Sequence, residues 1–161
     1  MDFYISKEEV VKSLNSTLGV VEKRQTLPIL SNVLLEVDES SLKITATDLE
    51  SEISTTSTIS NFKSGGKITA PARKLNDLCR LLPDLTEIHL FLDGDNLKIE
   101  TESGKYNIST LPSEDFPVFE LEEAKSQINI SSKNLKSIIT NTSFAMGNQD
   151  WRHYLNGLYL S

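Results

Sequence analysis

The sequence predicts an α+β fold in which two helices pack on antiparallel sheets, followed by the start of a second, similar module. Two stretches carry apolar residues at helical spacing, and many short stretches alternate apolar and polar residues as half-buried strands do. The strands follow one another without the regular strand–helix–strand order that implies a parallel sheet. A segment near the start of the chain also recurs near its end.

This recurrence has a constant offset. Residues 5–35 reappear, with conservative changes, at residues 130–160, always 125 positions later. A fixed period across a helix-like stretch, a loop and a strand-like stretch indicates duplicated modules, the alternative being chance matches among common apolar residues. We expect a complete first module at residues 1–122 and an incomplete second module at residues 123–161. The matched pairs are Ile5 with Ile130, Ser6 with Ser131, Val10 with Leu135, Leu14 with Ile139, Thr17 with Thr142, Leu30 with Leu155, Val33 with Leu158 and Leu35 with Leu160.

The first helix is expected from residue 7 to about residue 20. Ser6-Lys7-Glu8-Glu9 has the form of a capping box, in which the Ser and Glu side chains satisfy backbone amides at a helix start. An apolar stripe of Val10, Leu14, Leu18 and Val21 follows at helical spacing. After a connector that contains Pro28, strands are expected at residues 32–37, 42–46, 51–59 and 67–70.

A second helix is expected at residues 72–82, and Pro83 ends it because proline cannot continue a helix. Its apolar stripe is Leu75, Leu78, Cys79 and Leu82. Residues 111–125 carry two prolines and then a charged run, so we interpret them as the module boundary. A helix capped by Ser131 or Ser132 then belongs to the second module. The remaining strands are expected at residues 87–92, 97–102, 105–110 and 127–130, the first three joined by Asp-Gly and Ser-Gly hairpin turns.

The composition is that of an ordinary globular protein, with 161 residues, 38% hydrophobic and 24% charged. The start, Met1-Asp2-Phe3-Tyr4, lacks the basic and apolar regions of a signal peptide, and no stretch approaches the roughly 18 apolar residues of a membrane span. A cytoplasmic location is expected. Cys79 is the only cysteine, which leaves no partner for a disulfide, and we expect it to be a small buried hydrophobe.

The net charge of −7 argues at first against a nucleic-acid partner, because phosphate binding needs Lys and Arg. The charges are unevenly distributed, however. Residues 7–24, 72–82 and 132–155 together hold ten basic and five acidic residues, whereas the rest of the chain holds six and eighteen. The basic segments are those expected to be helical. A protein whose helices face one partner can therefore be acidic overall and still present a basic surface.

No group of residues points to catalysis, a metal or a cofactor. Asp48, Glu50 and Glu52 alternate as on a strand, whose spacing of about 6.6 to 7 Å between alternate residues is too wide for one cation, so a solvated face is favoured. Gly65-Gly66-Lys67 lacks the remainder of a phosphate-binding loop and is expected to be a hairpin turn. The histidines at positions 89 and 153 have no nearby pattern of a triad or zinc site. An enzyme is therefore disfavoured.

Arg24 and Gln149 differ from these in kind, because they are also 125 positions apart and so occupy the same place in the two modules. Both side chains donate hydrogen bonds that phosphate oxygens accept, and neither contact depends on base sequence. Ordinary solvent exposure is the alternative interpretation for both residues.

Five motifs in order along the whole chain resemble the bacterial DNA sliding clamp family, the β subunit of DNA polymerase III. This resemblance implies three similar modules per chain and two chains closed head to tail around duplex DNA, with helices lining the hole and sheets outside. The motifs are Arg24-Gln25-Thr26-Leu27-Pro28-Ile29-Leu30, Thr47-Asp48-Leu49-Glu50, Pro71-Ala72-Arg73-Lys74, Ser109-Thr110-Leu111-Pro112 with Asp115-Phe116-Pro117, and Gln149-Asp150-Trp151-Arg152-His153-Tyr154-Leu155-Asn156-Gly157.

The resemblance also implies roles for particular residues. His153 departs from the tyrosine expected at that position, and Asn96 and Ser103 lack positive charges that some members use at the subunit interface. The DNA-contacting positions are Arg24, Arg73, Gln149, His153 and Tyr154; the edge of the pocket that binds partner peptides is Arg152, Tyr154 and Leu155; the dimer interface includes Lys74, Leu78, Lys105 and Ile108.

The implied function is that of a processivity factor, a non-catalytic accessory subunit that tethers the replicative polymerase to double-stranded DNA without sequence preference. The chain is expected to hold the N-terminal portion of a full-length protein that forms a homodimer. Its implied protein partners are DNA polymerase III subunits, the clamp loader and other proteins with a clamp-binding motif. The alternative is a non-encircling scaffold or inhibitory binding module with a clamp-like fold.

Overall fold

The computed structural model describes residues 1–21, 27–119 and 127–160. The chain divides into two compact units, residues 1–120 and 121–161, and each is described by itself. The expected boundary between residues 122 and 123 lies outside the described residues and stays a prediction. Across the three described ranges, no helix is long and apolar enough to cross a membrane.

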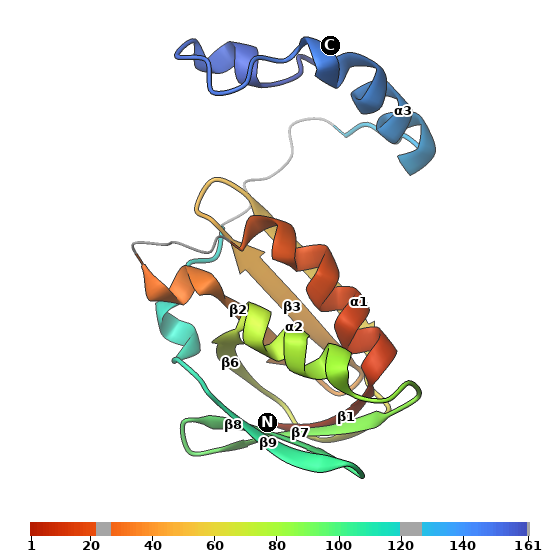
Figure 1. The fold of residues 1–161 in the computed structure, drawn as a ribbon, viewed down its shortest axis with the longest axis vertical. Helices are drawn as coiled ribbons and strands as arrows, with labels where there is room; N and C mark the ends of the chain where they lie inside the picture. Colours follow the sequence, from red (N-terminus) through yellow and green to blue (C-terminus); the bar gives the residue numbers. More distant parts are fainter. Residues whose placement is uncertain (22–26, 120–126, 161) are drawn as a thin grey trace. The chain divides into compact units, whose positions relative to one another are not determined.

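Unit 1 contains two antiparallel sheets (Figure 1). The five-stranded sheet has the order β5-β1-β7-β8-β9, and the four-stranded sheet has the order β4-β3-β2-β6. An isolated bridge between Thr69 and Leu111 joins the segment after β9 to the edge strand β6. The strands are β1 Asp2–Ser6, β2 Asn32–Val37, β3 Ser41–Thr47, β4 Glu52–Thr58, β5 Asn61–Ser64, β6 Gly66–Pro71, β7 Glu87–Asp93, β8 Asn96–Thr101 and β9 Gly104–Ser109.

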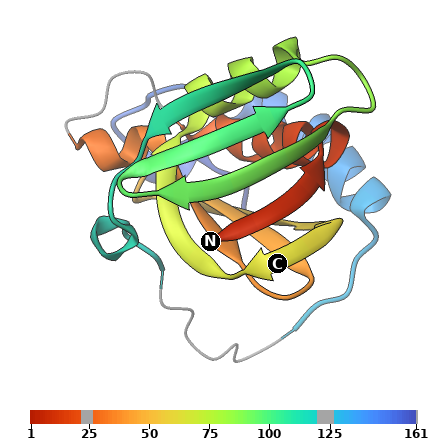
Figure 2. The same cartoon turned by 90° about the horizontal axis from the view of Figure 1, so that it is seen from below.

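Two helices, α1 (Lys7–Thr17) and α2 (Ala72–Leu81), lie side by side against these sheets (Figure 1). The Ser6 hydroxyl accepts a hydrogen bond from the Glu9 amide at 3.3 Å, which confirms the serine half of the predicted capping box; the Glu9 carboxylate accepts no bond from the Ser6 amide. The helices are antiparallel, because the Lys7 amide donates to the Thr86 carbonyl beyond the end of α2, while Arg73 at the start of α2 donates to Val21. Figure 2 shows β1, β7, β8 and β9 side by side with the helices beyond them.

One core forms where the apolar helix stripes meet the inner faces of both sheets. Leu14 of α1, Leu75 of α2, Ile44 of β3 and Ile88 of β7 are each at most 1% exposed. A polar contact also holds α1 against the four-stranded sheet. The Ser13 hydroxyl shares a buried hydrogen bond with the hydroxyl of Ser57 on the edge strand β4. The predicted stripes and the α+β class are confirmed.

Three local predictions were wrong. Between the helices there are five strands, since the polar segment β5 pairs with β1. Gly65 and Gly66 form no hairpin, because they carry the chain from the five-stranded sheet to the four-stranded one, where a Cβ on Gly65 would lie 2.8 Å from the Val37 carbonyl oxygen. Asp48 and Glu50 lie in the β3–β4 turn, where Asp48 Oδ1 accepts from the Glu50 and Ser51 amides.

Unit 2 repeats the local structure of unit 1 at the 125-residue offset. Its helix α3 is Ser132–Thr142, whose first and last residues are each 125 positions after those of α1. The short helices Leu18–Val20 and Pro28–Ser31 recur at the same offset as Ser143–Ala145 and His153–Asn156. Ser131 caps α3 by accepting from the Asn134 amide at 3.3 Å, as Ser6 caps α1.

The predicted strand at residues 127–130 does not form, and the described residues of unit 2 contain no strand. In unit 1 the corresponding strand β1 is held between β5 and β7, and a lone strand without such partners is not stable. The apolar stripe of α3 is exposed for the same reason. Ile139 is 43% exposed, whereas its counterpart Leu14 is fully buried.

We expect matched substitutions at Leu14 and Ile139 to have different effects on stability. Leu14→Ala should lower the free energy of unfolding of unit 1 by about 2 to 5 kcal/mol, because it leaves a cavity under α1. Ile139→Ala should change it by less than about 0.5 kcal/mol, as substitutions at the surface do. Urea unfolding followed by circular dichroism measures both changes, and a comparable loss from the two variants would contradict the different burial of the two helices.

Candidate nucleic-acid interface

Cationic side chains occupy the solvent-facing surfaces of α1 and α2. In each helix the buried residues define the inward face, so positions rotated away from it point to solvent. The exposed acidic residues of these helices are Glu8 of α1 and Asp77 of α2, and Lys7 of α1 is paired with Asp84. The exposed cationic residues are Lys12 of α1 and Arg73, Lys74 and Arg80 of α2.

These four cations differ from those on the strands in how they are paired. Every lysine on a strand of unit 1 lies within salt-bridge distance of a carboxylate, and none of the four helix cations does so with any described residue. The strand pairs are Lys43 and Lys67 with Glu36, Lys63 with Asp2, Lys98 with Asp93, and Lys105 with Glu100.

Glu36, which pairs with Lys43 and Lys67 on the four-stranded sheet, shows the effect of this neutralisation. Burial alone would raise the pKa of Glu36, but the ammonium groups of Lys67 and Lys43 lower it below its ordinary value. Glu36 therefore stays charged and cancels part of the local positive potential. The strand lysines of unit 1 are thus locally compensated, while Lys12, Arg73, Lys74 and Arg80 remain able to attract an external anion.

Arg73 makes one identified contact within the protein. Its Nη2 donates to the Val21 carbonyl at 2.6 Å, which ties the start of α2 to the end of the short helix after α1. A guanidinium has five N–H donors, so this bond leaves others for phosphate oxygens. Arg24, the predicted DNA contact that follows Val21, lies outside the described residues.

In unit 2, a hydrogen-bonded loop presents the other predicted DNA contacts. Gln149 is exposed and has a positive φ of 55°, which turns the backbone sharply. The Gly147 amide donates to the Leu155 carbonyl at 2.8 Å, and Asn156 bonds both the amide and the carbonyl of Asp150. His153 and Tyr154 follow in a short helix, where Tyr154 is 78% exposed.

Arg152 is held by its neighbour instead of pointing freely into solvent. Its Nε and Nη2 donate to the two carboxylate oxygens of Asp150 at 3.1 and 3.0 Å. Hydrogen bonds from the Arg152 side chain and amide lower the pKa of Asp150. Tyr154 and Leu155 line a shallow hollow of about 320 Å³ together with Ile138 of α3, and Arg152 is not among the residues that line it.

The residues predicted at a dimer interface are in different environments. Lys74 is exposed, and Leu78 is half-buried against the core. The Lys105 ammonium donates to Glu100 at 2.8 Å. Ile108 is fully buried in the core of unit 1, so it can reach a partner only through its backbone. Its strand β9 is an edge of the five-stranded sheet, and edge strands present unpaired backbone groups.

The structure also shows contacts that sequence reasoning missed. His89 Nε2 lies 2.7 Å from Asp2 Oδ1, and its ring stacks on Tyr4 with centroids 4.3 Å apart. His89 is therefore not isolated, but 87 residues separate it from Asp2 and no sequence pattern joins them.

Cys79 is buried, which raises its thiol pKa to about 12 and confirms its expected role in the core. No group of three metal-ligating side chains occurs among the described residues.

Comparison with known proteins identifies the family. The sequence profile described as DNA polymerase III beta subunit, N-terminal domain, matches residues 1–121. The chain belongs to the DNA polymerase III beta subunit family. The curated beta sliding clamps of Vibrio cholerae and Pseudomonas aeruginosa are 40% and 42% identical to this beta-subunit chain over 158 and 160 residues.

Solved beta subunits have the same fold. The DNA polymerase III subunit beta of Pseudomonas aeruginosa superimposes with a TM-score of 0.94 at 41% identity, and the polymerase sliding clamp of Caulobacter crescentus with 0.93 at 37%. These alignments cover 98% and 99% of this chain and 43% of each solved chain. The alignments with the two curated relatives cover 98% and 99% of this chain but only 43% and 44% of the relatives. This chain therefore spans less than half of their length.

The Asp150–Arg152 pair gives a pH-dependent prediction. Because the folded pKa of Asp150 lies below its usual 3.8, the pair stabilises the loop above that pH and loses this effect as the pH falls through the folded pKa. In Arg152→Ala, the carboxyl should titrate closer to 3.8. Carbon-detected NMR titration of Asp150 measures this shift, and an unchanged midpoint would show that Arg152 does not cause the depression.

Proposed function

We propose that this protein acts as a DNA sliding clamp, a processivity factor that encircles duplex DNA and tethers the replicative polymerase. The observation that carries this proposal is a contrast in pairing: Lys12, Arg73, Lys74 and Arg80 have no salt-bridge partner among the described residues, whereas every strand lysine of unit 1 has one. Membership of the beta-subunit family supports it, because the relatives are named as sliding clamps and polymerase subunits.

The charge arrangement suits a partner that is recognised by its phosphates alone. Lysine and arginine side chains attract the DNA backbone, and such contacts carry no sequence information. They also exchange readily, which allows movement along the duplex. In this proposal Arg24, Arg73, Gln149, His153 and Tyr154 contact DNA. The proposal includes a non-catalytic accessory role in the cytoplasm, and the naming of the relatives as sliding clamps supports it.

Encirclement requires more modules than this chain contains, so the proposal concerns a protein of the relatives' length. The free edge of β9 supports a homodimer in which a strand of the second subunit extends the five-stranded sheet. Lys74, Leu78 and Lys105 would flank this junction, and Ile108 would contribute its backbone. Arg152, Tyr154 and Leu155 are proposed to form the edge of the pocket for polymerase subunits, the clamp loader and other clamp-binding-motif proteins.

Topological retention tests encirclement directly. The natural gene product at full length, loaded onto nicked circular DNA by its clamp loader, should remain bound in high salt and be lost when the circle is cut. Leu78→Asp should abolish retention by opening the interface. Gel filtration of the DNA-bound fraction measures the result, and equal retention on linear and circular DNA would rule out a ring.

Substitutions at Arg73 test whether this residue contacts phosphate. Arg73→Ala in the full-length protein should weaken binding equally for unrelated sequences and reduce the slope of log K against log salt by about 0.9. Arg73→Lys should keep most of that slope, because it keeps the charge. Lys43→Ala, on a compensated strand, is the control. Fluorescence anisotropy at several salt concentrations measures the slope; if Arg73→Ala behaves like the control, Arg73 does not contact phosphate.

A further inference from the structure

The end of α2 and the loop between α2 and β7 expose two leucines. Leu81 is 88% exposed and Leu85 is 90% exposed, with Pro83 between them also at the surface. A single exposed leucine is common on protein surfaces. Two so close together, one at the helix end and one on the loop that follows, form a local apolar projection of the kind that marks interaction sites.

The first turn of α1 holds this loop in place. The Lys7 ammonium donates to the Leu82 carbonyl at 2.6 Å and to Asp84 at 2.7 Å. The Leu85 amide donates to Glu8 Oε1 at 2.8 Å, and this bond accompanies a φ of 60° that a leucine rarely adopts. The Leu85 side chain is therefore presented to solvent by a braced backbone, so little conformational entropy would be lost when it is covered.

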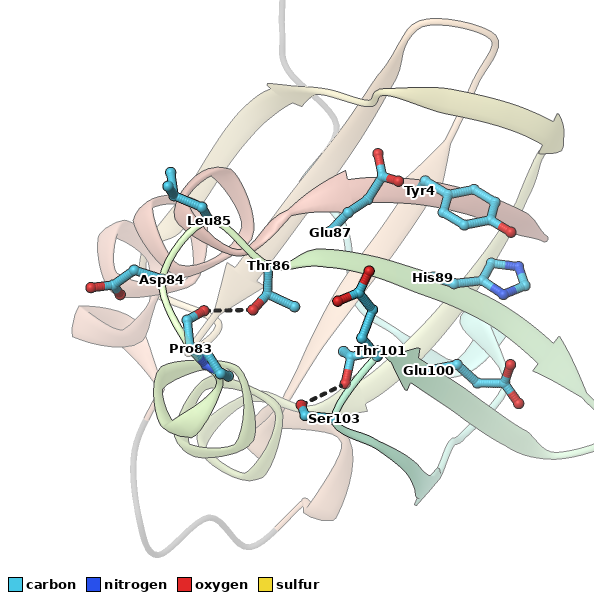
Figure 3. A pocket seen from close by; sticks show the side chains of 11 residues that line it. Tyr4, Pro83, Asp84, Leu85, Thr86, Glu87, His89, Glu100, Thr101 and Ser103 are labelled. Carbon is cyan, nitrogen blue, oxygen red and sulfur yellow. Dashed lines mark hydrogen bonds between the residues drawn. The ribbon is translucent and has the colours of Figure 1, made fainter.

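A hollow of about 650 Å³ adjoins this loop (Figure 3). Tyr4 and His89 lie next to each other along one part of it (Figure 3). Its carboxylates are Asp84, Glu87, Glu100 and Glu102.

Lys7 compensates Asp84, and Lys105 compensates Glu100. Glu87 accepts only the Ser60 hydroxyl, at 2.8 Å, and neither Glu87 nor Glu102 has a salt-bridge partner among the described residues. The hollow therefore carries uncompensated negative charge next to exposed leucines.

We propose that this loop and hollow dock a partner protein through a short segment in which leucine-like side chains are flanked by lysine or arginine. The leucines at positions 81 and 85 supply the apolar contact, and Glu87 and Glu102 select the basic flanks. The same charge repels nucleic acid. None of the four helix cations lines the hollow, and Ser103 at its β8–β9 end adjoins the proposed dimer edge at Lys105. Docking of a basic, leucine-containing segment goes beyond the proposed clamp function.

The test uses the 161-residue chain and a short fluorescein-labelled peptide that contains two leucines, each flanked by lysines. Anisotropy should show saturable, salt-sensitive binding, and nitrogen-15 NMR should place the shifted amides at residues 81–87 and 100–103. A peptide with both leucines replaced by serine should bind at least tenfold more weakly, by roughly the cost of losing an apolar anchor. No saturable binding up to about 1 mM would overturn the proposal.

Matched variants locate the site. Leu85→Ser and Glu102→Lys should each weaken binding by roughly tenfold. Leu49→Ser is the control for the first, because Leu49 is also exposed with a positive φ, of 74°, but lies in the β3–β4 turn. Glu39→Lys, in the exposed β2–β3 turn, is the control for the second. Equal weakening by the controls would overturn the proposal, as would a self-association in sedimentation equilibrium that Leu85→Ser abolishes, since the occupant would then be a second copy.

Discussion

The burial of α1 against the sheets is the contact on which the rest of unit 1 depends. Val10 and Leu14 enter the core, and the Ser13 hydroxyl bonds Ser57 on β4, so one face of the helix is fixed inward. The opposite face, with Lys12, must then face solvent. The same reasoning for α2 directs Lys74 outward. The cationic surface is therefore a consequence of core packing, and a loss of that packing would also disperse the charges that we propose to attract DNA.

Unit 2 shows which features survive without a sheet. The cap at Ser131, the limits of α3 and the short helix after it all match unit 1, because each depends on neighbours within a few residues. The strand at residues 127–130 and the burial of Ile139 are lost, because both depend on strands distant in sequence. Local helical structure is thus encoded within each repeat, while sheet structure requires the rest of a module.

The same distinction explains what the sequence could predict. The Ser6 cap, the proline-limited second helix and the Asp-Gly and Ser-Gly hairpins are local signals, and the structure has all of them within about two residues of the predicted positions. The strand β5 was missed because its polar sequence has no alternation and its stability comes from β1, far away in the chain. The segmental charge pattern predicted a basic helix surface, but whether a lysine is neutralised by a cross-strand carboxylate, as Lys43 is by Glu36, depends on strand register.

We propose that this protein contacts DNA through its helices and not through its sheets. Nitrogen-15 NMR of the chain, titrated with a short duplex of arbitrary sequence at low salt, tests this most directly. We expect the amide resonances near Lys12, Arg73 and Arg80 to shift and to return on adding salt, and those near Lys43, Lys67 and Lys98 to remain unshifted. Shifts concentrated on the strand lysines, with α1 and α2 unperturbed, would contradict it.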